Sequence, residues 1–382
     1  MSLDLTVCLT PADTLNYPEG GGHLWVFLNW ALGLKALGCR PIWLERFPMK
    51  LAPAKALANV LALKQNLEFA GMGDSLALYS DSHDKLPVEL KGLCLNLDTA
   101  SKADLLLDLQ YTLPAEIVGR FSRSALVDID PGLLQIWMTD RKFMTAAHDV
   151  YFSIGETVGA AGSNIPDCGV RWNYTPPPVS LEHWPPAKTT DGGRYTTVAH
   201  WYYGEMNRQG ETFNNDKRVS FMEYLSLPQT VDAPLELALC LGDSDDPADP
   251  ERLLWEENGW YVRHSWDVTG GPFDYQRYIQ ESRGEFSCAK PSCMRLQNAW
   301  VSDRTLCYLA SGKPAIVQYT GASRILPEAA GLFRFRTLAE AAAAIECVEA
   351  DYENQCRLAR ALAEEHFDAR KVVTAVLKKA FA

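Results

Sequence analysis

A glycine-rich loop close to the start of the chain constrains the fold most strongly. Residues 20–23 read Gly-Gly-Gly-His and follow an apolar segment at 5–9. Residues 24–37 form a long apolar stretch, and 41–44 are a second apolar run. The order strand, glycine loop, helix and strand predicts the first unit of a parallel α/β sheet.

The same loop has properties of a ligand-binding turn. Glycine lets a backbone approach a ligand closely, and the free N–H groups at a helix N-terminus favour negative charge. His23 adds a group that titrates near neutral pH. The spacing is not that of the dinucleotide fingerprint, and Glu45 is a weak candidate for a ribose ligand. Taken alone, a glycine-rich loop after the first strand is more often an ordinary turn than a ligand-binding site.

The second half of the chain again alternates short apolar runs with amphipathic ones. Strands of that length between helices predict a parallel sheet with both faces covered. The expected strands are 197–201, 235–241, 260–264, 285–288 and 315–318, and the expected helices are 217–225, 250–257, 275–282 and 299–311.

A proline- and glycine-rich stretch at 172–194 separates the two halves. Proline lacks an amide donor and fixes φ, so this stretch cannot continue a helix or a central strand. We therefore expect an N-terminal domain at 1–171, a linker at 172–194 and a C-terminal domain at 195–382, with the last helices free to pack back on the first domain. Both domains are expected to be Rossmann-like.

Composition indicates a globular enzyme in the cytoplasm. The 382 residues are 47% hydrophobic, and no run approaches the roughly 18 apolar residues of a membrane helix. The N-terminus lacks a signal-peptide pattern. The ten cysteines form no CxxC motif, which is typical of reduced thiols. The formal charge of −12 argues against binding to a nucleic-acid scaffold.

A group of charged and polar residues surrounds the predicted strand at 285–288 and the helix after it. Lys290, Arg295 and Arg304 can converge with Ser302 at the carboxyl end of the sheet. Cations near a helix start suit a diphosphate. Asp303 would be costly beside phosphates unless it pairs with Arg304 or accepts from sugar hydroxyls. A surface salt-bridge cluster is the alternative interpretation.

Two patches of the chain resemble the GT-B glycosyltransferases, which transfer sugars from nucleotide diphosphates. One is the loop at 20–23, and the other is the run at 308–317, with its small residue, glycine and proline before the last donor-domain strand. The general layout extends the resemblance to nearly the whole chain. It implies two Rossmann-like domains facing a central cleft, the first binding an acceptor and the second binding a nucleotide-sugar, without a cofactor.

The resemblance also implies roles for individual residues. His23 matches the histidine that serves some members as general base, and Asp13 or Glu19 could orient or replace it. A helix glutamate usually binds the donor ribose, but Cys307 stands at that position here, which leaves Asp303 as the substitute.

Further donor contacts follow from the same layout. The indole of Trp266 could stack on the base, although a buried core tryptophan is an equally good interpretation. The polar loop after residue 201 could bring backbone amides to the phosphates, and Thr320 with Gly321 could approach the sugar. The donor-side candidates are Gly21, Gly22, Tyr202, Gly204, Glu205, Arg208, Trp266, Lys290, Arg295, Ser302, Asp303, Arg304, Thr320 and Gly321.

A metal site is the less favoured interpretation. Asp128 and Asp130 form a DxD pattern, which could hold a divalent cation on one face of a strand but also suits a strand-ending turn. We expect no metal, and an inverting single displacement onto a small-molecule or saccharide acceptor. A nucleotide-sugar epimerase of the same fold, a non-catalytic nucleotide-sugar-binding protein and a Rossmann-type oxidoreductase are the alternatives.

Overall fold

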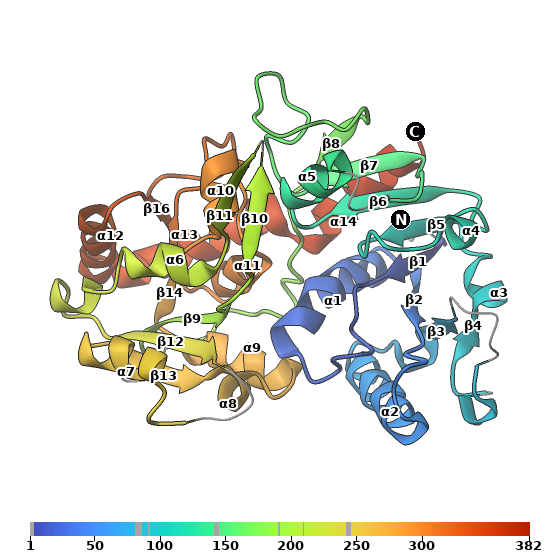
Figure 1. The fold of residues 1–382 in the computed structure, drawn as a ribbon, viewed down its shortest axis with the longest axis horizontal. Helices are drawn as coiled ribbons and strands as arrows, with labels where there is room; N and C mark the ends of the chain where they lie inside the picture. The colour runs from blue at the N-terminus through green and yellow to red at the C-terminus, as the bar shows by residue number, and fades with distance from the viewer. Residues whose placement is uncertain are drawn as a thin grey trace. The chain divides into compact units, whose positions relative to one another are not determined.

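The computed structural model describes residues 4–80, 86–90, 92–140, 145–189, 192–208, 210–241 and 246–382. These residues form two compact α/β units (Figure 1). Unit 1 comprises Met1–Ser180 with Asp368–Ala382, and unit 2 comprises Leu181–Phe367. Unit 2 begins before the predicted start at 195, and the last helix belongs to unit 1, which the prediction allowed.

The expected linker begins too early, because its first residues form a strand. Trp172–Tyr174 is β8, the edge strand of the unit 1 sheet, and the prolines follow it. An edge strand tolerates proline directly after it, whereas a central strand does not. At the other end, the chain returns to unit 1 only with its last helix, α14 (Ala369–Ala380).

Unit 1 contains a parallel sheet of eight strands among the residues described. The strand order is β4-β3-β2-β1-β5-β6-β7-β8. The strands are β1 (Thr6–Thr10), β2 (Arg40–Arg46), β3 (Leu76–Tyr79), β4 (Leu95–Asn96), β5 (Leu105–Asp108), β6 (Ser124–Asp128), β7 (Val150–Ser153) and β8.

The helices of unit 1 include two that pack closely on each other, α1 (Gly21–Ala36) and α14. Helix α1 is apolar around most of its circumference and largely buried. Gly33 makes the close approach possible, since a Cβ there would lie 2.7 Å from Val373 Cγ2 and 2.9 Å from the Ala369 carbonyl oxygen. The other helices are α2 (Pro53–Phe69), α3 (Leu97–Ala100), α4 (Ala115–Val118) and α5 (Leu133–Thr139), with 3-10 turns at Gly73–Ser75 and Val88–Leu90.

Unit 2 is built on a second parallel sheet, which has six strands in the described part of the chain. Their order is β13-β12-β9-β14-β15-β16, and a separate antiparallel hairpin, β10-β11, follows β9. The strands are β9 (Tyr195–His200), β10 (Glu205–Arg208), β11 (Glu211–Asn214), β12 (Leu235–Cys240), β13 (Tyr261–His264), β14 (Gly284–Ser287), β15 (Ala315–Gln318) and β16 (Leu332–Phe335).

The helices of unit 2 cover a core that is rich in aromatic side chains. Trp201, Phe221, Trp255, Phe286 and Phe335 form its centre, with the Phe286 and Phe335 rings stacked 5.2 Å apart. The helices are α6 (Lys217–Met222), α7 (Pro250–Glu257), α8 (Ser265–Thr269), α9 (Pro272–Glu281), α10 (Pro291–Leu296), α11 (Asp303–Ala310), α12 (Leu338–Ala350) and α13 (Tyr352–Leu362), with a 3-10 turn at Leu227–Gln229 and a π-helical turn at Ala363–Phe367. None of the helices that the structure describes has the length and apolar character needed to cross a membrane.

Each sheet has a point at which the direction of strand addition reverses. In unit 1 this switch point lies between β1 and β5, and in unit 2 it lies between β9 and β14. Open α/β sheets bind ligands in the crevice at the carboxyl ends of the strands that flank such a point. The two switch points are therefore where functional side chains are to be sought.

Replacing Gly33 with alanine tests the packing of α1 on α14. Alanine has the better helix propensity, by about 1 kcal/mol, but its methyl group would push α14 away. We expect the Gly33→Ala variant to lose about 1–2 kcal/mol of unfolding free energy in urea. Val373→Ala should recover part of that loss in the double variant. An unchanged or increased stability of Gly33→Ala would contradict the close contact.

Candidate functional site

The switch point of unit 2 opens because β9 and β14 are paired only at their beginnings. The ladder joins Tyr195 to Gly284 and Thr196 to Glu285, whereas β9 and β12 are paired along the whole of β9. Beyond Glu285 the peptide groups of the two strands need other partners, because a buried peptide group without a hydrogen bond is costly.

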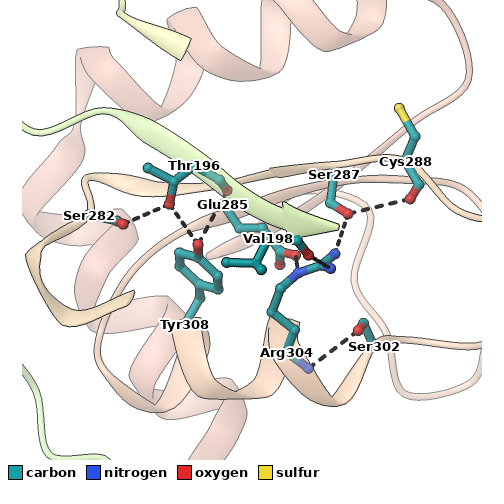
Figure 2. A network of polar contacts seen from close by, with 9 residues as sticks. All are labelled: Thr196, Val198, Ser282, Glu285, Ser287, Cys288, Ser302, Arg304 and Tyr308. Carbon is teal, nitrogen blue, oxygen red and sulfur yellow. Dashed lines mark hydrogen bonds and ion pairs between the residues drawn. The ribbon is translucent and has the colours of Figure 1, made fainter. Parts of the chain in front are cut away.

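Arg304 supplies those partners from helix α11 (Figure 2). Its Nη1 donates to the Val198 carbonyl oxygen of β9 at 2.7 Å, and its Nη2 donates to Ser287 Oγ of β14. Its Nε donates to Glu285 Oε1 at 2.8 Å, and both side chains of this ion pair are buried. The guanidinium therefore bridges the two strands at the point where their ladder ends.

These contacts revise two of the expected ligand contacts. Arg304 is held in the sheet by three partners, so it contributes a buried positive charge beneath the crevice and not a phosphate contact at its surface. The Ser302 hydroxyl is likewise occupied, since it caps α11 by accepting from the Arg304 amide at 3.3 Å. Asp303 is the first residue of α11 and is half-buried.

Two lysines lie with Arg304 at this edge. Lys290 caps α10 directly after β14, and its Nζ lies 4.5 Å from the centre of the Tyr203 ring. Lys217 is the first residue of α6, and the sequence analysis did not select it. Burial, followed by the positive charges of Arg304 and Lys290, lowers the pKa of Lys217 to about 7. Its position directly after Asp216, at the start of the first helix after the switch-point strand, was the available signal.

His200, the last residue of β9, belongs to the same group. Its side chain is exposed, and partial desolvation, followed by the charges of Lys217 and Lys290, lowers the pKa of its imidazole. Desolvation is the largest cause of both shifts, and the neighbouring positive charges add to it.

Two buried polar groups beside the lysines have no partner. Asn215 Oδ1 accepts from the Ser292 amide at 2.8 Å, but Asn215 Nδ2 and Ser292 Oγ make no hydrogen bond. Asn215 is 0% exposed and Ser292 is 1% exposed. An unsatisfied buried group costs about 1–3 kcal/mol, so donors left in this state indicate a place where a ligand completes the hydrogen bonds.

The loop between α10 and α11 adds a backbone in an unusual conformation. Gln297 and Ala299 have φ angles of 51° and 52°. Gly321 packs against this loop with a φ of 133°, and a Cβ there would lie 2.7 Å from the Gln297 carbonyl oxygen. Thr320 Oγ1 donates to the Trp300 carbonyl oxygen at 2.6 Å. Thr320 and Gly321 thus support the loop, and the Thr320 hydroxyl is occupied.

Arg295 is directed to the hairpin and not to the lysines. It forms an ion pair with Glu211 at 2.7 Å, and its guanidinium lies 4.1 Å from the centre of the Phe213 ring. Both residues are on β11, so the structure does not bring Arg295 together with Lys290 as expected.

The polar stretch after β9 is the β10-β11 hairpin and not an open loop. Asp216 accepts hydrogen bonds from the amides of Tyr203 and Gly204, which closes the base of the hairpin. These amides are therefore not available to a phosphate, contrary to expectation. The other candidates of this stretch are Tyr202, which is 48% exposed, and Glu205 and Arg208, which begin and end β10.

Trp266 stands in the first turn of α8, beyond the end of β13. Its side chain is 48% exposed and contacts the His264 ring edge-on at 5.3 Å. A buried core position is therefore excluded, and the indole face remains accessible for stacking.

The switch point of unit 1 has the opposite character. Asp108, at the end of β5, accepts from Thr10 Oγ1 at 2.8 Å and from the Gln110 amide at 3.0 Å. Its second oxygen lies 3.2 Å from His148 Nε2 without hydrogen-bond geometry, and both side chains are fully buried. A carboxylate and an imidazole thus fill the floor of this crevice.

His23 lies in the first turn of α1, which begins at Gly21 and is capped by Gly20. Gly21 and Gly22 are therefore helical residues of unit 1 and not a loop. His23 Nε2 lies 2.6 Å from the Ala12 carbonyl oxygen. Because a carbonyl only accepts, Nε2 carries the proton and Nδ1 holds the lone pair of the neutral ring.

The carboxylates near His23 are arranged differently from the prediction. Asp13 is exposed and interacts with Asn16 and Arg46, the latter at 3.9 Å, and Glu19 is exposed. Glu45, a weak candidate for a ribose ligand from the sequence, is 2% exposed near the end of β2. Burial raises its pKa to about 8, although Thr14 and Trp43 donate hydrogen bonds to it.

Asp128 of the DxD pattern is hydrogen-bonded within unit 1. Gln135 Nε2 and Ser153 Oγ donate to Asp128 Oδ2 at 2.8 and 2.7 Å, and the Asp130 amide donates to the other oxygen at 3.0 Å. Burial raises the pKa of Asp128 to about 7. In the described residues no group of three or more His, Cys, Asp or Glu side chains could hold a metal ion.

The two arginines expected to bind a diphosphate should differ sharply in their effect on stability. Arg304→Met leaves Glu285 buried and unpaired, so we expect a loss of about 3–5 kcal/mol of unfolding free energy. Arg295→Met removes an exposed ion pair, so we expect a loss below about 1 kcal/mol. Chemical denaturation of both variants measures the difference. Equal small losses would show that Glu285 does not depend on Arg304.

No protein-family model and no curated protein sequence matches this chain. Solved structures do. An alpha-glucosyltransferase in complex with UDP has a TM-score of 0.59 at 11% identity, over 99% of this chain and 100% of that one. Anabaena HepE in complex with UDP and glucose has a TM-score of 0.57 at 12% identity, over 98% of this chain and 99% of that one. A glycosyltransferase from Rickettsia africae has a TM-score of 0.52 at 11% identity, over 99% of this chain and 98% of that one.

These likenesses cover the whole chain and not one unit alone. They confirm the predicted fold class, with a parallel α/β sheet in each of two units. The chain has the GT-B fold of these glycosyltransferases.

Proposed function

We propose that this protein is a glycosyltransferase that moves a sugar from a nucleoside-diphosphate donor to an acceptor hydroxyl. The observation that carries the proposal is the group of Lys217, Lys290 and Arg304 at the switch point of unit 2, beside buried donors without partners. Solved structures of the same fold contain UDP or UDP-glucose, so we take UDP as the nucleotide.

The donor lies along the carboxyl edge of unit 2 in this proposal. Lys290 and Lys217 bind the diphosphate, with Asn215 Nδ2 and Ser292 Oγ as further donors. Arg304 adds a buried positive charge near the diphosphate without contacting it directly. Trp266 stacks on the base, because its indole face is exposed at this edge. Asp303 accepts from the ribose hydroxyls.

The acceptor binds to unit 1, where His23 acts as the base. Its Nδ1 takes the proton of the acceptor hydroxyl, whose oxygen attacks the anomeric carbon. The bond to the diphosphate breaks, and the diphosphate leaves with the electron pair. This single displacement inverts the anomeric centre. General-base assistance is typically worth about 10²–10⁴-fold.

Fixed cations replace a metal ion in this mechanism. Two lysines with a buried arginine supply the positive charge that stabilises a leaving diphosphate. The carboxylates of the DxD pattern cannot replace them, since Asp128 is engaged by Gln135 and Ser153.

The class of acceptor is proposed from charge. Some solved structures of this fold contain DNA, so the fold does not exclude a nucleic-acid acceptor. The net charge of −12 and the buried carboxylates of unit 1 favour a small molecule or a saccharide. A cytoplasmic location stays a prediction.

The proposal predicts that one substitution slows sugar transfer without changing the affinity for UDP, and that another weakens the binding of UDP. Wild-type protein, incubated with UDP-sugars and a panel of saccharide acceptors in excess chelator, should release UDP and form a glycosylated product detected by mass spectrometry. His23→Ala should turn over about 10²–10⁴-fold more slowly with unchanged affinity for UDP. Lys290→Ala should weaken the thermal stabilisation by UDP, which follows from binding to the native state.

Lys378→Ala on α14 of unit 1 is the matched control, because it removes the same charge outside unit 2. This variant should show the same thermal stabilisation by UDP as the wild type. Conversion of the donor sugar without acceptor would instead identify the epimerase. Activity lost in chelator and restored by manganese would refute the metal-free mechanism, and loss of UDP affinity in His23→Ala would refute the role of His23 as base.

A further inference from the structure

The loop between β1 and α1, residues 11–20, is anchored to the rest of unit 1 by buried side chains. It contains no helix or strand, yet Thr14 and Leu15 within it are fully buried. Asn59 Nδ2 of α2 donates a hydrogen bond to the Leu15 carbonyl oxygen at 3.0 Å, and Asn59 is itself buried. The loop that leads to His23 is therefore held in one conformation.

Glu45 is the acceptor on which this anchoring depends. It is a buried residue of β2. Its carboxyl accepts hydrogen bonds from the Thr14 hydroxyl, from the Leu15 amide and, at 3.3 Å, from Trp43 Nε1. Trp43 Nε1 also donates to Thr14 Oγ1 at 3.2 Å. Because a buried polar group without a hydrogen bond is costly, the carboxyl and the loop each keep the other in place.

Asp13 lies between the two fixed points of the loop. Its φ is 53°, in the left-handed region that residues other than glycine seldom adopt. On one side of it, the Ala12 carbonyl oxygen accepts from His23 Nε2 at 2.6 Å. On the other side, Thr14 donates to Glu45. Such a backbone conformation persists only where the surrounding structure determines it, so the direction of the Ala12 carbonyl depends on the contact that holds Thr14.

Aromatic packing also links the His23 ring to this group. The imidazole lies edge-on to the Phe27 ring, with the ring centres 5.3 Å apart, and Phe27 lies edge-on to Trp43 at 6.5 Å. Phe27 and Trp43 are both buried. Packing limits where the His23 ring can lie, whereas the hydrogen bond to the Ala12 carbonyl decides which ring nitrogen carries the proton.

We propose that Glu45 is a positioning residue for His23 and acts through Thr14 and the Ala12 carbonyl. The proposal rests on the function proposed above, in which His23 Nδ1 is the base. By holding Thr14, the carboxyl keeps the Ala12 oxygen directed at Nε2, so that the proton stays on Nε2 and the lone pair on Nδ1. A backbone carbonyl thus orients the base, a role that a third side chain has in many catalytic sites. No bond to Glu45 forms or breaks during the transfer.

The experiment combines NMR of the histidine rings with turnover. In protein labelled with ¹⁵N in its histidine side chains, the Nε2 proton of His23 should give a resonance, because the hydrogen bond to the Ala12 carbonyl slows its exchange with water. The resonance is assigned by its absence in His23→Ala. In Thr14→Val and in Glu45→Met we expect the resonance to be lost through faster exchange. The kcat of sugar transfer should fall by up to about 10²-fold, with unchanged affinity for UDP.

Conservative variants of the same residues separate positioning from a general loss of stability. Glu45→Gln keeps an acceptor oxygen and Thr14→Ser keeps the hydroxyl, so both should retain the His23 resonance and most of the turnover. Asp128→Asn is the matched control, because it changes another buried carboxyl of unit 1, at the end of β6. It should leave the resonance in place. Thr14→Val is close to threonine in shape, so it tests the inference even if Glu45→Met does not fold.

The results distinguish this inference from the function on which it rests. A His23 resonance and a kcat that are unchanged in Thr14→Val and Glu45→Met would overturn the inference and leave the proposed function standing. A lower kcat with an intact resonance would also overturn it, because the effect would not pass through His23. Absence of sugar transfer by the wild type would refute the proposed function, whereas the resonance decides separately whether Glu45 holds the ring.

Discussion

The ion pair between Arg304 and Glu285 is the interaction on which the candidate site depends. It lies where the ladder of β9 and β14 ends, and Arg304 satisfies the Val198 carbonyl that the ladder leaves unpaired. A buried ion pair is rarely stabilising overall, but losing one partner is costly. The pair therefore joins β14 to α11 at the point where the two strands separate.

The charge of each switch point follows from what is buried beneath it. In unit 2 desolvation, and after it the charge of the buried Arg304 guanidinium, lowers the pKa of Lys217. In unit 1 the buried groups are carboxylates, and the pKa values of Glu45 and Asp128 rise because burial dominates over their hydrogen bonds. The two switch points therefore differ in the sign of the charged side chains buried at them.

The architecture was predictable because strands buried on both faces read as short apolar runs. The regular spacing of those runs located β1 and β2 in unit 1 and β9, β12 and β15 in unit 2, but it did not locate the central strand β5 of unit 1. The β10-β11 hairpin was missed because its residues are polar and mostly exposed, so no apolar alternation marks them. The start of the linker was placed too early, since the prolines that define it follow an edge strand and do not replace it.

The site was less predictable, because a sequence shows which side chains are charged but not what they face. Arg304 looked like a phosphate ligand, and its partner Glu285 lies 19 residues away on another element. Lys217 was overlooked because its importance comes from Lys290 and Arg304, which are distant in the sequence. The positions of His23 and Trp266 after strands are retained in the fold, and their functional roles stay predictions.

A crystal structure of the protein with UDP tests the central claim most directly. The account predicts β-phosphate oxygens within hydrogen-bond distance, about 2.7–3.2 Å, of the Nζ atoms of Lys217 and Lys290, with Arg304 still paired with Glu285. UDP bound with its phosphates away from both lysines, or an Arg304 side chain released from Glu285 to bind phosphate, would contradict it.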